Sequence, residues 1–347
     1  MDIIKYEHQS NVYTSKLFDK YYKDLKIGVF DIETMGLNPS YSEVILVGIM
    51  EVLSDGKCII TQYFAENKSE EPELLAALDE EFKKYDYVLT YNGKHFDIPF
   101  IEKRFVKNGL KPCRTLPHNL DLYLLLNGHS ELKKILPNMK QKSVEEYMGF
   151  KIDRKDEISG ADSVKMYEAF VSETDENIKA DLKEKILLHN HDDLLQLYQL
   201  MPIIQKTNFH RGMSYLGFPV KGSNGWPQLN TGKVRVDTKG VHITGTYRGE
   251  TFSYMSYEGF NTHYSCSFEE DGTFSFLLPV ERVKGSIFVA LGQFIDNPDT
   301  LSVLSAFPGH VNGYLILCEN NQASFMELNM FIKAFLSEFM DNPNCPL

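Results

Sequence analysis

The first strongly apolar segment of the chain, residues 26–33 (KIGVFDIE), contains two carboxylates near its end, Asp31 and Glu33. Its composition predicts a buried strand, and Gly36 and Pro39 predict a turn directly after it. Successive side chains of a strand point to opposite faces, so Asp31 and Glu33 share one face. An acidic pair at a strand end is commonly a solvated edge or a helix cap. The role of this pair therefore depends on what else gathers around the end of the strand.

Two further clusters of polar residues occur later in the chain. In YNGKHFDIPFI, Asp97 stands at the start of an expected helix, where an aspartate is often only an N-cap. In LLHNHDDLLQL, His189 and Asp193 lie four residues apart on an expected helix and so share a face. Asp192 is expected to point away from that face, and His191 into solvent. Taken alone, each residue of this cluster is accounted for by a solvated helix surface.

Strand and helix patterns alternate through the first two thirds of the chain, which is typical of an α/β domain. We expect strands at 26–33, 42–53, 57–66, 86–93 and 119–126, and helices at 69–85, 97–110 and through most of 142–207. The helix at 69–85 has acidic residues and Pro72 near its start and lysines at its end, the polarity that the helix dipole favours.

The pattern changes near residues 205–215. Residues 212–320 alternate between polar and apolar side chains and are rich in turn residues, which predicts antiparallel strands, and residues 325–340 predict a closing helix. Three parts are therefore expected: an N-terminal extension (1–24), an α/β domain (25–207) and a smaller β-rich C-terminal domain (212–347), for which the sequence indicates no function.

Composition narrows the classes of function. The net charge of −12 argues against nucleic-acid binding by bulk positive charge. A nuclease whose site holds cations stays open, because there the ions face the phosphate. The five cysteines are scattered and form no CxxC pair, which predicts free thiols in a reducing compartment, the cytoplasm. We find no apolar run long enough to span a membrane and no signal-peptide pattern, so no membrane partner is expected.

Taken together and in order, the three clusters resemble the motifs of the DEDD exonuclease superfamily, the DnaQ-like branch of the RNase H fold. The matching residues are Asp31-Ile32-Glu33-Thr34, Asn92 with Phe96-Asp97, and Asp193. The segments LKKILPNMKQKSVEEYMGF, DRKDEISGADSVKMYEAF and ILLHNHDDLLQL are similar to those of the YprB-like predicted exonuclease group. The resemblance covers about residues 25–205. It implies an RNase H-like domain in which helices flank a mixed central sheet.

The resemblance also implies a site for two divalent cations, Mg²⁺ or Mn²⁺. Converging carboxylates repel one another, and cations turn this repulsion into binding because these hard ions prefer oxygen ligands. The implied ligands are Asp31, Glu33, Asp97 and Asp193. The residues implied to bind the terminal nucleotide of the substrate are Thr34, Leu37, Asn92 and Phe96.

The third motif departs from the superfamily pattern at the general base, which is usually a His five residues before the last Asp or a Tyr four before it. Here His189 stands four residues before Asp193, and Leu188 stands five before it. His189 is the predicted catalytic residue, as a general base or as a group that only orients the water. A purely structural hydrogen bond is the alternative. Asp121 is expected to support the site or to act as a fifth carboxylate.

The implied activity is 3′→5′ exonucleolytic hydrolysis of single-stranded DNA or RNA by a two-metal-ion mechanism. An endonuclease or structure-specific nuclease on the same site is one alternative, because carboxylates alone do not select strand ends. A non-catalytic nucleic-acid-binding protein that keeps the fold is the other. In the C-terminal domain, Trp226 and the many Tyr and Phe residues form either a stacking surface for bases or, as is more common, a core.

Overall fold

The computed structural model describes residues 1–111, 115–150, 160–222, 227–259, 262–342 and 345. The chain divides into two compact units: unit 1 comprises residues 1–18 and 23–207, and unit 2 comprises residues 19–22 and 208–347. Three features named above lie outside the described residues: Cys113, Trp226 and residues 153–159 of the second YprB-like segment.

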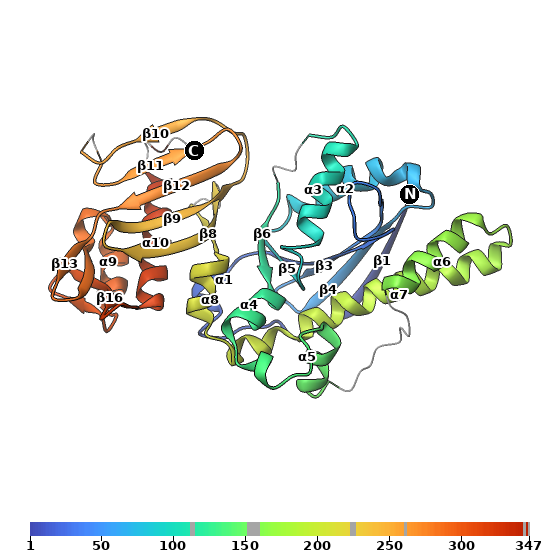
Figure 1. Ribbon diagram of the computed structural model, residues 1–347, viewed down its shortest axis with the longest axis horizontal. Coiled ribbons are helices and arrows are strands. Elements are labelled where there is room, and N and C mark those ends of the chain that lie inside the picture. Colours follow the sequence, from blue (N-terminus) through green and yellow to red (C-terminus); the bar gives the residue numbers. More distant parts are fainter. Residues whose placement is uncertain (112–114, 151–159, 223–226, 260–261, 343–344, 346–347) are drawn as a thin grey trace. The chain divides into compact units, whose positions relative to one another are not determined.

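Unit 1 is built on a six-stranded mixed sheet with the strand order β1-β4-β3-β2-β5-β6 (Figure 1). Its strands are β1 (Asp2–Gln9), β2 (Ile27–Thr34), β3 (Val44–Val52), β4 (Lys57–Phe64), β5 (Tyr87–Thr90) and β6 (His118–Asp121). β2 is antiparallel to β3 and parallel to β5, which is parallel to β6. Because β2, β5 and β6 run in one direction, their carboxyl ends meet at the same edge of the sheet.

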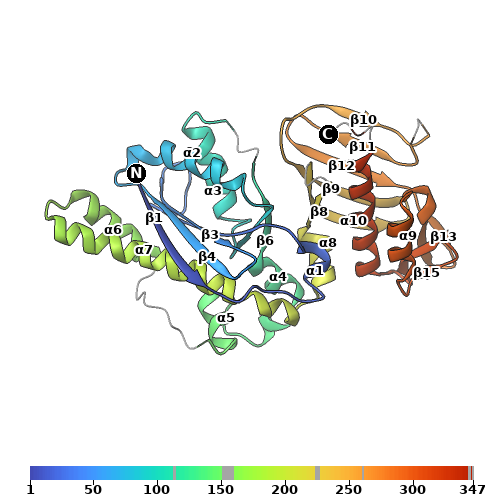
Figure 2. The ribbon, with the colours of Figure 1, turned by 180° about the vertical axis from the view of Figure 1, so that it is seen from behind.

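Helices cover both faces of this sheet (Figures 1 and 2). They are α2 (Glu71–Phe82), α3 (Asp97–Lys107), α4 (Leu122–His129), α5 (Gln141–Tyr147), α6 (Gly160–Ser172) and α7 (Glu176–Gln199), with 3-10 helices η1 (Lys68–Glu70), η2 (Leu132–Lys134) and η3 (Met201–Lys206). On one face Phe82 of α2 packs against Phe30, and on the other Tyr167 of α6 packs against Phe64. The expected α/β class, with a mixed sheet between helices, is confirmed.

The first residues of the chain, expected to be an extension, contain an edge strand. β1 pairs with β4 along its whole length, from Asp2 opposite Phe64 to Gln9 opposite Lys57. Its residues alternate between partly buried and exposed. The partly buried residues are Asp2, Ile4, Tyr6 and His8, so only two of the four inward-facing side chains are apolar. A period-two hydrophobic signal is therefore weak here.

The segment 119–126, expected to be a strand, changes structure at its middle. β6 ends at Asp121, and α4 begins at Leu122. The Asp121 carboxylate accepts a hydrogen bond from the Leu124 backbone N–H and so caps the helix. The leucines that follow have high helix propensity and no β-branch, so the cap decides where the strand stops.

The described part of unit 2 contains two antiparallel sheets. One has the order β10-β11-β12-β9-β8-β7, and the other has the order β13-β14-β16-β15, with β17 beside β16. The strands are β7 (Pro219–Lys221), β8 (Gln228–Asp237), β9 (Gly240–Tyr247), β10 (Tyr254–Ser256), β11 (Ser265–Phe268), β12 (Thr273–Leu278), β13 (Glu281–Val283), β14 (Ser286–Ala290), β15 (His310–Val311), β16 (Tyr314–Glu319) and β17 (Gln322–Ala323).

The helices of unit 2 are α1 (Asp19–Tyr22), α8 (Phe209–Leu216), α9 (Pro298–Ser305) and α10 (Phe325–Asp341), with the 3-10 helix η4 (Leu291–Gln293). The expected β-rich region and closing helix are confirmed, whereas α8 and α9 were not expected. The short α1 belongs here because Tyr21 is buried in this unit. The Tyr21 hydroxyl lies 2.6 Å from Nδ1 of His210 and accepts a hydrogen bond from Asn329.

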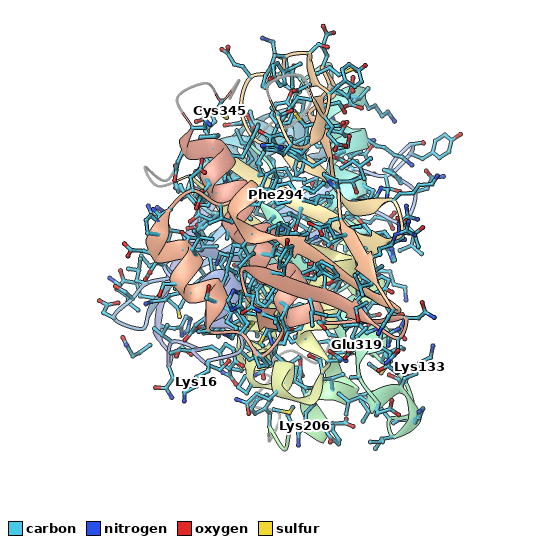
Figure 3. All side chains as sticks on the ribbon, turned by 90° about the vertical axis from the view of Figure 1, so that its left-hand side faces the viewer. Lys16, Lys133, Lys206, Phe294, Glu319 and Cys345 are labelled. Atoms are coloured by element: carbon cyan, nitrogen blue, oxygen red, sulfur yellow. The ribbon has the colours of Figure 1, made fainter. Side chains whose placement is uncertain are left out.

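Many aromatic side chains of unit 2 form its core. Phe339 of α10 stacks on Phe268 of β11 with a centroid separation of 5.8 Å. Phe294, which Figure 3 labels, packs against Phe331 of α10. Phe268 and Phe331 are fully buried. These rings act as a core rather than as a stacking surface for bases.

Among the described residues, Cys58, Cys266 and Cys318 are free thiols, as expected. Among the described residues, no helix combines the length and the apolar character that crossing a bilayer requires.

A buried ion pair holds the α2–α3 face of unit 1 together. Arg104 of α3 donates from Nε and Nη2 to the two carboxylate oxygens of Glu71, and both side chains are almost fully buried. Glu71 also accepts hydrogen bonds from the Val44 backbone N–H and from Asn108 Nδ2. Arg104 Nη1 donates to the Pro39 carbonyl in the loop after β2. One carboxylate thus joins α2, α3, the start of β3 and that loop.

We predict that Arg104→Met lowers the free energy of unfolding by about 3–5 kcal/mol, because it leaves the Glu71 carboxylate buried without its cation. Urea denaturation measures the loss. The matched control is Lys83→Met, which removes the exposed Lys83–Glu80 pair of the same face and should change stability by less than about 0.5 kcal/mol. Equal effects of the two changes would show that burial of the Arg104 pair is not what matters.

Candidate functional site

Two acidic side chains come from the central strand of unit 1. Asp31 and Glu33 lie near the carboxyl end of β2, between β3 and β5. Glu33 is buried and Asp31 is partly buried. The strand must pass through the core because both sheet faces are covered by helices. The carboxylates of Asp31 and Glu33, near the carboxyl end of β2, are therefore largely shielded from water.

A third carboxylate reaches the same place from the strand beside β2. After β5 the chain turns at Asn92, whose positive φ of 68° is a conformation that asparagine tolerates. The Asn92 carbonyl accepts hydrogen bonds from the backbone N–H groups of His95 and Phe96, and Asp97 then starts α3. The turn is held by Asp121, which accepts hydrogen bonds from the backbone N–H groups of Asn92 and Lys94. These contacts fit a supporting role for Asp121.

The fourth carboxylate comes from α7, which packs across the other face of the sheet. Nε2 of His189 lies 3.7 Å from Oε1 of Glu33 and 3.8 Å from Oδ2 of Asp193. His189 is buried, and Asp193 keeps about a quarter of its side chain exposed. The i, i+4 spacing therefore brings both side chains to the end of β2, as one helix face requires.

Asp192 and His191 belong to a different cluster. Nδ1 of His191 lies 3.0 Å from Oδ1 of Asp192, and its Nε2 lies 2.8 Å from Nε2 of His8 on β1. The prediction that His191 faces solvent is wrong, because β1 covers that side of α7. The partner of His191 is His8 on the edge strand β1, a strand that the sequence pattern did not predict.

The electrostatics of the site reflect four acids at close range. Burial, reinforced in turn by the charges of Asp97, Asp193 and Glu33, raises the pKa of Asp31 well above its usual range. Burial also raises the pKa of Asp97 to about 7, with Asp121 adding to the shift and backbone N–H groups opposing it. Carboxyl groups that resist ionisation in this way gain most from a neighbouring cation.

The donor set fits a hard divalent cation. It consists of carboxylate oxygens on three different elements, the ligands that Mg²⁺ and Mn²⁺ prefer. Within the described residues, no three His, Cys, Asp or Glu side chains already stand in the arrangement of a closed metal cage. The residues that would hold a cation are Asp31, Glu33, Asp97 and Asp193.

Sequence reasoning missed a group that holds Asp31 in place. Asn190 of α7 is fully buried and donates from Nδ2 to Oδ2 of Asp31 at 2.8 Å. Its Oδ1 accepts a hydrogen bond from Gln62 of β4. Asn190 lies so close to β3 that a Cβ on Gly48 would stand 2.0 Å from its Oδ1. Gly48 within the run VILVGIME was the available signal, since a glycine inside a strand often marks a close approach.

The four residues expected to bind substrate occupy different positions. Thr34 is buried, and its hydroxyl donates to the Gly36 carbonyl. Leu37 is 85% exposed on the loop that Arg104 anchors. Phe96 is partly buried against the core beside α3, and Asn92 forms the turn before it. Asn92 and Phe96 thus flank Asp97, while Thr34 and Leu37 follow Glu33.

Comparison with known proteins gives one family match. A family model described as the RNase_H superfamily matches residues 29–205. No curated protein matches the sequence.

Among solved structures, the chain is similar to the family B DNA polymerase from the hyperthermophilic archaeon Pyrobaculum calidifontis, at 21% identity and a TM-score of 0.41, over 52% of this chain and 25% of the polymerase. It is also similar to exonuclease I, at 11% identity and a TM-score of 0.38, over 65% of this chain and 55% of that protein. A product-bound structure of exonuclease I matches at 10% identity and a TM-score of 0.36, over 90% of this chain and 69% of that one. The chain therefore spans a quarter of the polymerase and little more than half of the first exonuclease I structure.

We predict that Gly48→Ala lowers the free energy of unfolding by about 1–3 kcal/mol, because the new Cβ forces Asn190 away from Gln62 and Asp31. Gly128→Ala is the matched control, since nothing lies within 4 Å of a Cβ at that position of α4. It should leave stability unchanged or raise it by up to about 1 kcal/mol. Chemical denaturation compares the two, and a Gly48→Ala protein as stable as wild type would contradict the close approach of α7 to β3.

Proposed function

The chain belongs to the RNase H superfamily, and on this premise we propose that unit 1 is a nuclease domain that hydrolyses phosphodiester bonds with the help of divalent cations. In its finer form the proposal is a DEDD-type 3′→5′ exonuclease of the YprB-like group, acting on single-stranded DNA or RNA. Two ions, Mg²⁺ or Mn²⁺, are proposed for each site. The free cysteines suit a reducing compartment, and we propose the cytoplasm.

The observation that carries the proposal is the convergence of four carboxylates from β2, α3 and α7. Asp31 is near enough to Asp97, Asp193 and Glu33 for each to raise its pKa. A chain gains no stability from crowding like charges in a buried place. The cost is explained if the site exists to bind cations, and hence to act on a phosphate.

Each residue of the site has a separate role in the proposed reaction. When bound, divalent cations would neutralise the charge that develops on the phosphate and lower the pKa of the attacking water. Asp31, Glu33, Asp97 and Asp193 provide the oxygen ligands. His189 presents Nε2 to Glu33 and Asp193, so that nitrogen is placed to accept the proton of the water or to orient it. Asn190 keeps the Asp31 carboxylate in one orientation.

The residues proposed to seat the terminal nucleotide are neighbours of these carboxylates in the sequence. Asn92 and Phe96 lie just before Asp97, and Thr34 follows Glu33. Leu37 is exposed on a loop that α3 holds at two neighbouring residues, by Arg104 at Pro39 and by Lys107 at Ser40. An apolar side chain on a fixed loop suits contact with a base rather than with the phosphate.

Two rivals share the same site. An endonuclease or structure-specific nuclease would use the same carboxylates with a substrate path open at both ends. A non-catalytic nucleic-acid-binding protein would keep the fold without turnover. The presence of all four carboxylates argues against the second rival, because a binding protein has no use for their repulsion.

We predict that the protein degrades a 5′-labelled single strand from its 3′ end in Mg²⁺ or Mn²⁺ and releases nucleoside monophosphates, whereas a circular single strand stays intact. Excess EDTA should abolish the reaction. Gel analysis of both substrates over time makes the measurement. Cleavage of the circle would favour the endonuclease, and full activity in EDTA with no tightly held metal by elemental analysis would refute the cation mechanism.

We predict that Asp193→Asn removes almost all activity, whereas Asp192→Asn changes it little because its Oδ1 can still accept a hydrogen bond from His191. His189→Ala should lower the single-turnover rate by about 10²–10⁴-fold if His189 is the general base. His189→Tyr should restore part of that rate. An inactive Asp192→Asn protein would mean that the wrong face of α7 has been assigned to the site.

A further inference from the structure

A pocket of about 440 Å³ lies in unit 1 beside the carboxylates. Its volume is within the range of small-ligand sites. Aromatic rings, two carboxamides and one ammonium group line it: the residues are Tyr91, Tyr123, Met139, Asn92, Gln141 and Lys140. Apart from Asn92, none of these residues has a role in the site described above.

Two hydrogen-bonded links place this pocket next to the proposed ligands. Nε2 of Gln141, at the start of α5, donates to the backbone carbonyl of Asp193 at 3.3 Å and to Glu145 at 2.9 Å. Asn92 belongs to the turn that delivers Asp97. The pocket therefore adjoins the second and the third motif at once.

The rings of the pocket are held in fixed positions. Tyr91 and Tyr123 meet edge to face with a centroid separation of 5.8 Å, and the Tyr91 hydroxyl donates to the Met139 carbonyl at 2.6 Å. Fixed aromatic rings offer a stacking face to a nucleobase of any identity. The carboxamide of Asn92 can pair with the donor and acceptor groups on a base edge, and Oε1 of Gln141 can accept a hydrogen bond while its Nε2 holds Glu145 and Asp193.

One segment that contributes to the pocket is rich in lysine. The segment 132–143 contains four lysines and no acidic residue, although the chain carries a net charge of −12. Lys140 lines the pocket and is exposed, and Lys133 is exposed as well (Figure 3). A local cationic segment beside an acidic site is what a phosphate backbone requires to approach it.

We propose that this pocket binds one nucleotide of the substrate strand, adjacent to the nucleotide that is released, by stacking against Tyr123 and Tyr91 and by a phosphate contact with Lys140. The proposal rests on the nuclease function proposed above and adds the form of its substrate. A base can enter the pocket only when it is unpaired, so the strand must be single there. It must also extend beyond one nucleotide.

The first test compares a substrate that reaches the pocket with one that does not. A short labelled oligonucleotide spans it, whereas the p-nitrophenyl ester of thymidine 5′-monophosphate has no second nucleotide. Tyr123→Leu and Lys140→Ala should each raise KM for the oligonucleotide, by roughly 5- to 150-fold for the loss of stacking. The kcat and KM for the small ester should stay unchanged. Wild-type KM for the oligonucleotide in both variants would overturn the proposal.

Matched controls separate the pocket from general effects of size and charge. Tyr147→Leu removes a partly exposed tyrosine of α5 that does not line the pocket, and Lys165→Ala removes an exposed lysine of α6. Both should leave the oligonucleotide KM at its wild-type value. A rise equal to that of the pocket variants would assign the effect to overall charge or surface and overturn the proposal.

A binding measurement keeps this test independent of catalysis. Fluorescence anisotropy of a labelled five-nucleotide strand in Ca²⁺, a divalent cation whose looser coordination than that of Mg²⁺ disfavours turnover, reports affinity. If the wild-type protein cleaves neither substrate, the proposed nuclease function fails, and the pocket is still judged by binding. Weaker binding by Tyr123→Leu and Lys140→Ala, but not by the controls, supports the pocket. Unchanged affinity in the pocket variants, or no binding by wild type, overturns it.

Discussion

The hydrogen bond from Asn190 to Asp31 joins the helix that carries the third motif to the strand that carries the first. It depends on the close approach of α7 to β3, which Gly48 permits, and on Gln62, which holds the other side of the Asn190 carboxamide. Because Asn190 and Gln62 are fully buried, their hydrogen bonds leave little freedom in how the helix lies on the sheet. The same contact therefore fixes where His189 and Asp193 stand relative to Glu33.

The opposite face of the sheet is fixed by a different kind of contact. There Glu71 and Arg104 form a buried ion pair whose remaining hydrogen-bonding capacity is used by Val44, Asn108 and the Pro39 carbonyl. A buried pair of this type adds little net stability but penalises other arrangements, since each alternative leaves a charge without its partner. The loop that exposes Leu37 thus has a defined position although it lies on the surface.

The distribution of charge is compatible with the proposed action of an acidic protein on an anionic polymer. The net charge of −12 includes the proposed ligands, whose repulsion bound cations would relieve. Recognition of the strand then needs only local positive charge and aromatic faces, which the segment 132–143 and the pocket beside it provide. Bulk charge is a poor guide to the substrate of such a site.

Local sequence determined the parts of this protein whose signals are short in range. The apolar run of β2, the acidic start of α2, the position of Asp97 after β5 and the i, i+4 spacing of His189 and Asp193 all follow from periodicity and from residue chemistry. The three motifs also indicated the RNase H superfamily, because their order along the chain is itself informative. The end of β6 was misjudged, since a single N-cap, Asp121, outweighed the pattern of the residues after it.

Only the tertiary structure decided which residues meet across the sheet. The bond between Asn190 and Asp31, the contact of His191 with His8, and the pocket shared by Tyr91 and Tyr123 join residues that are 32–183 positions apart. Two of the four inward-facing side chains of β1 are polar, so the strand that pairs with β4 shows only a weak period-two hydrophobic pattern in the sequence. Periodicity reports which face of an element is buried, but it carries no information about the partner that buries it. That partner is set by the packing of the whole unit.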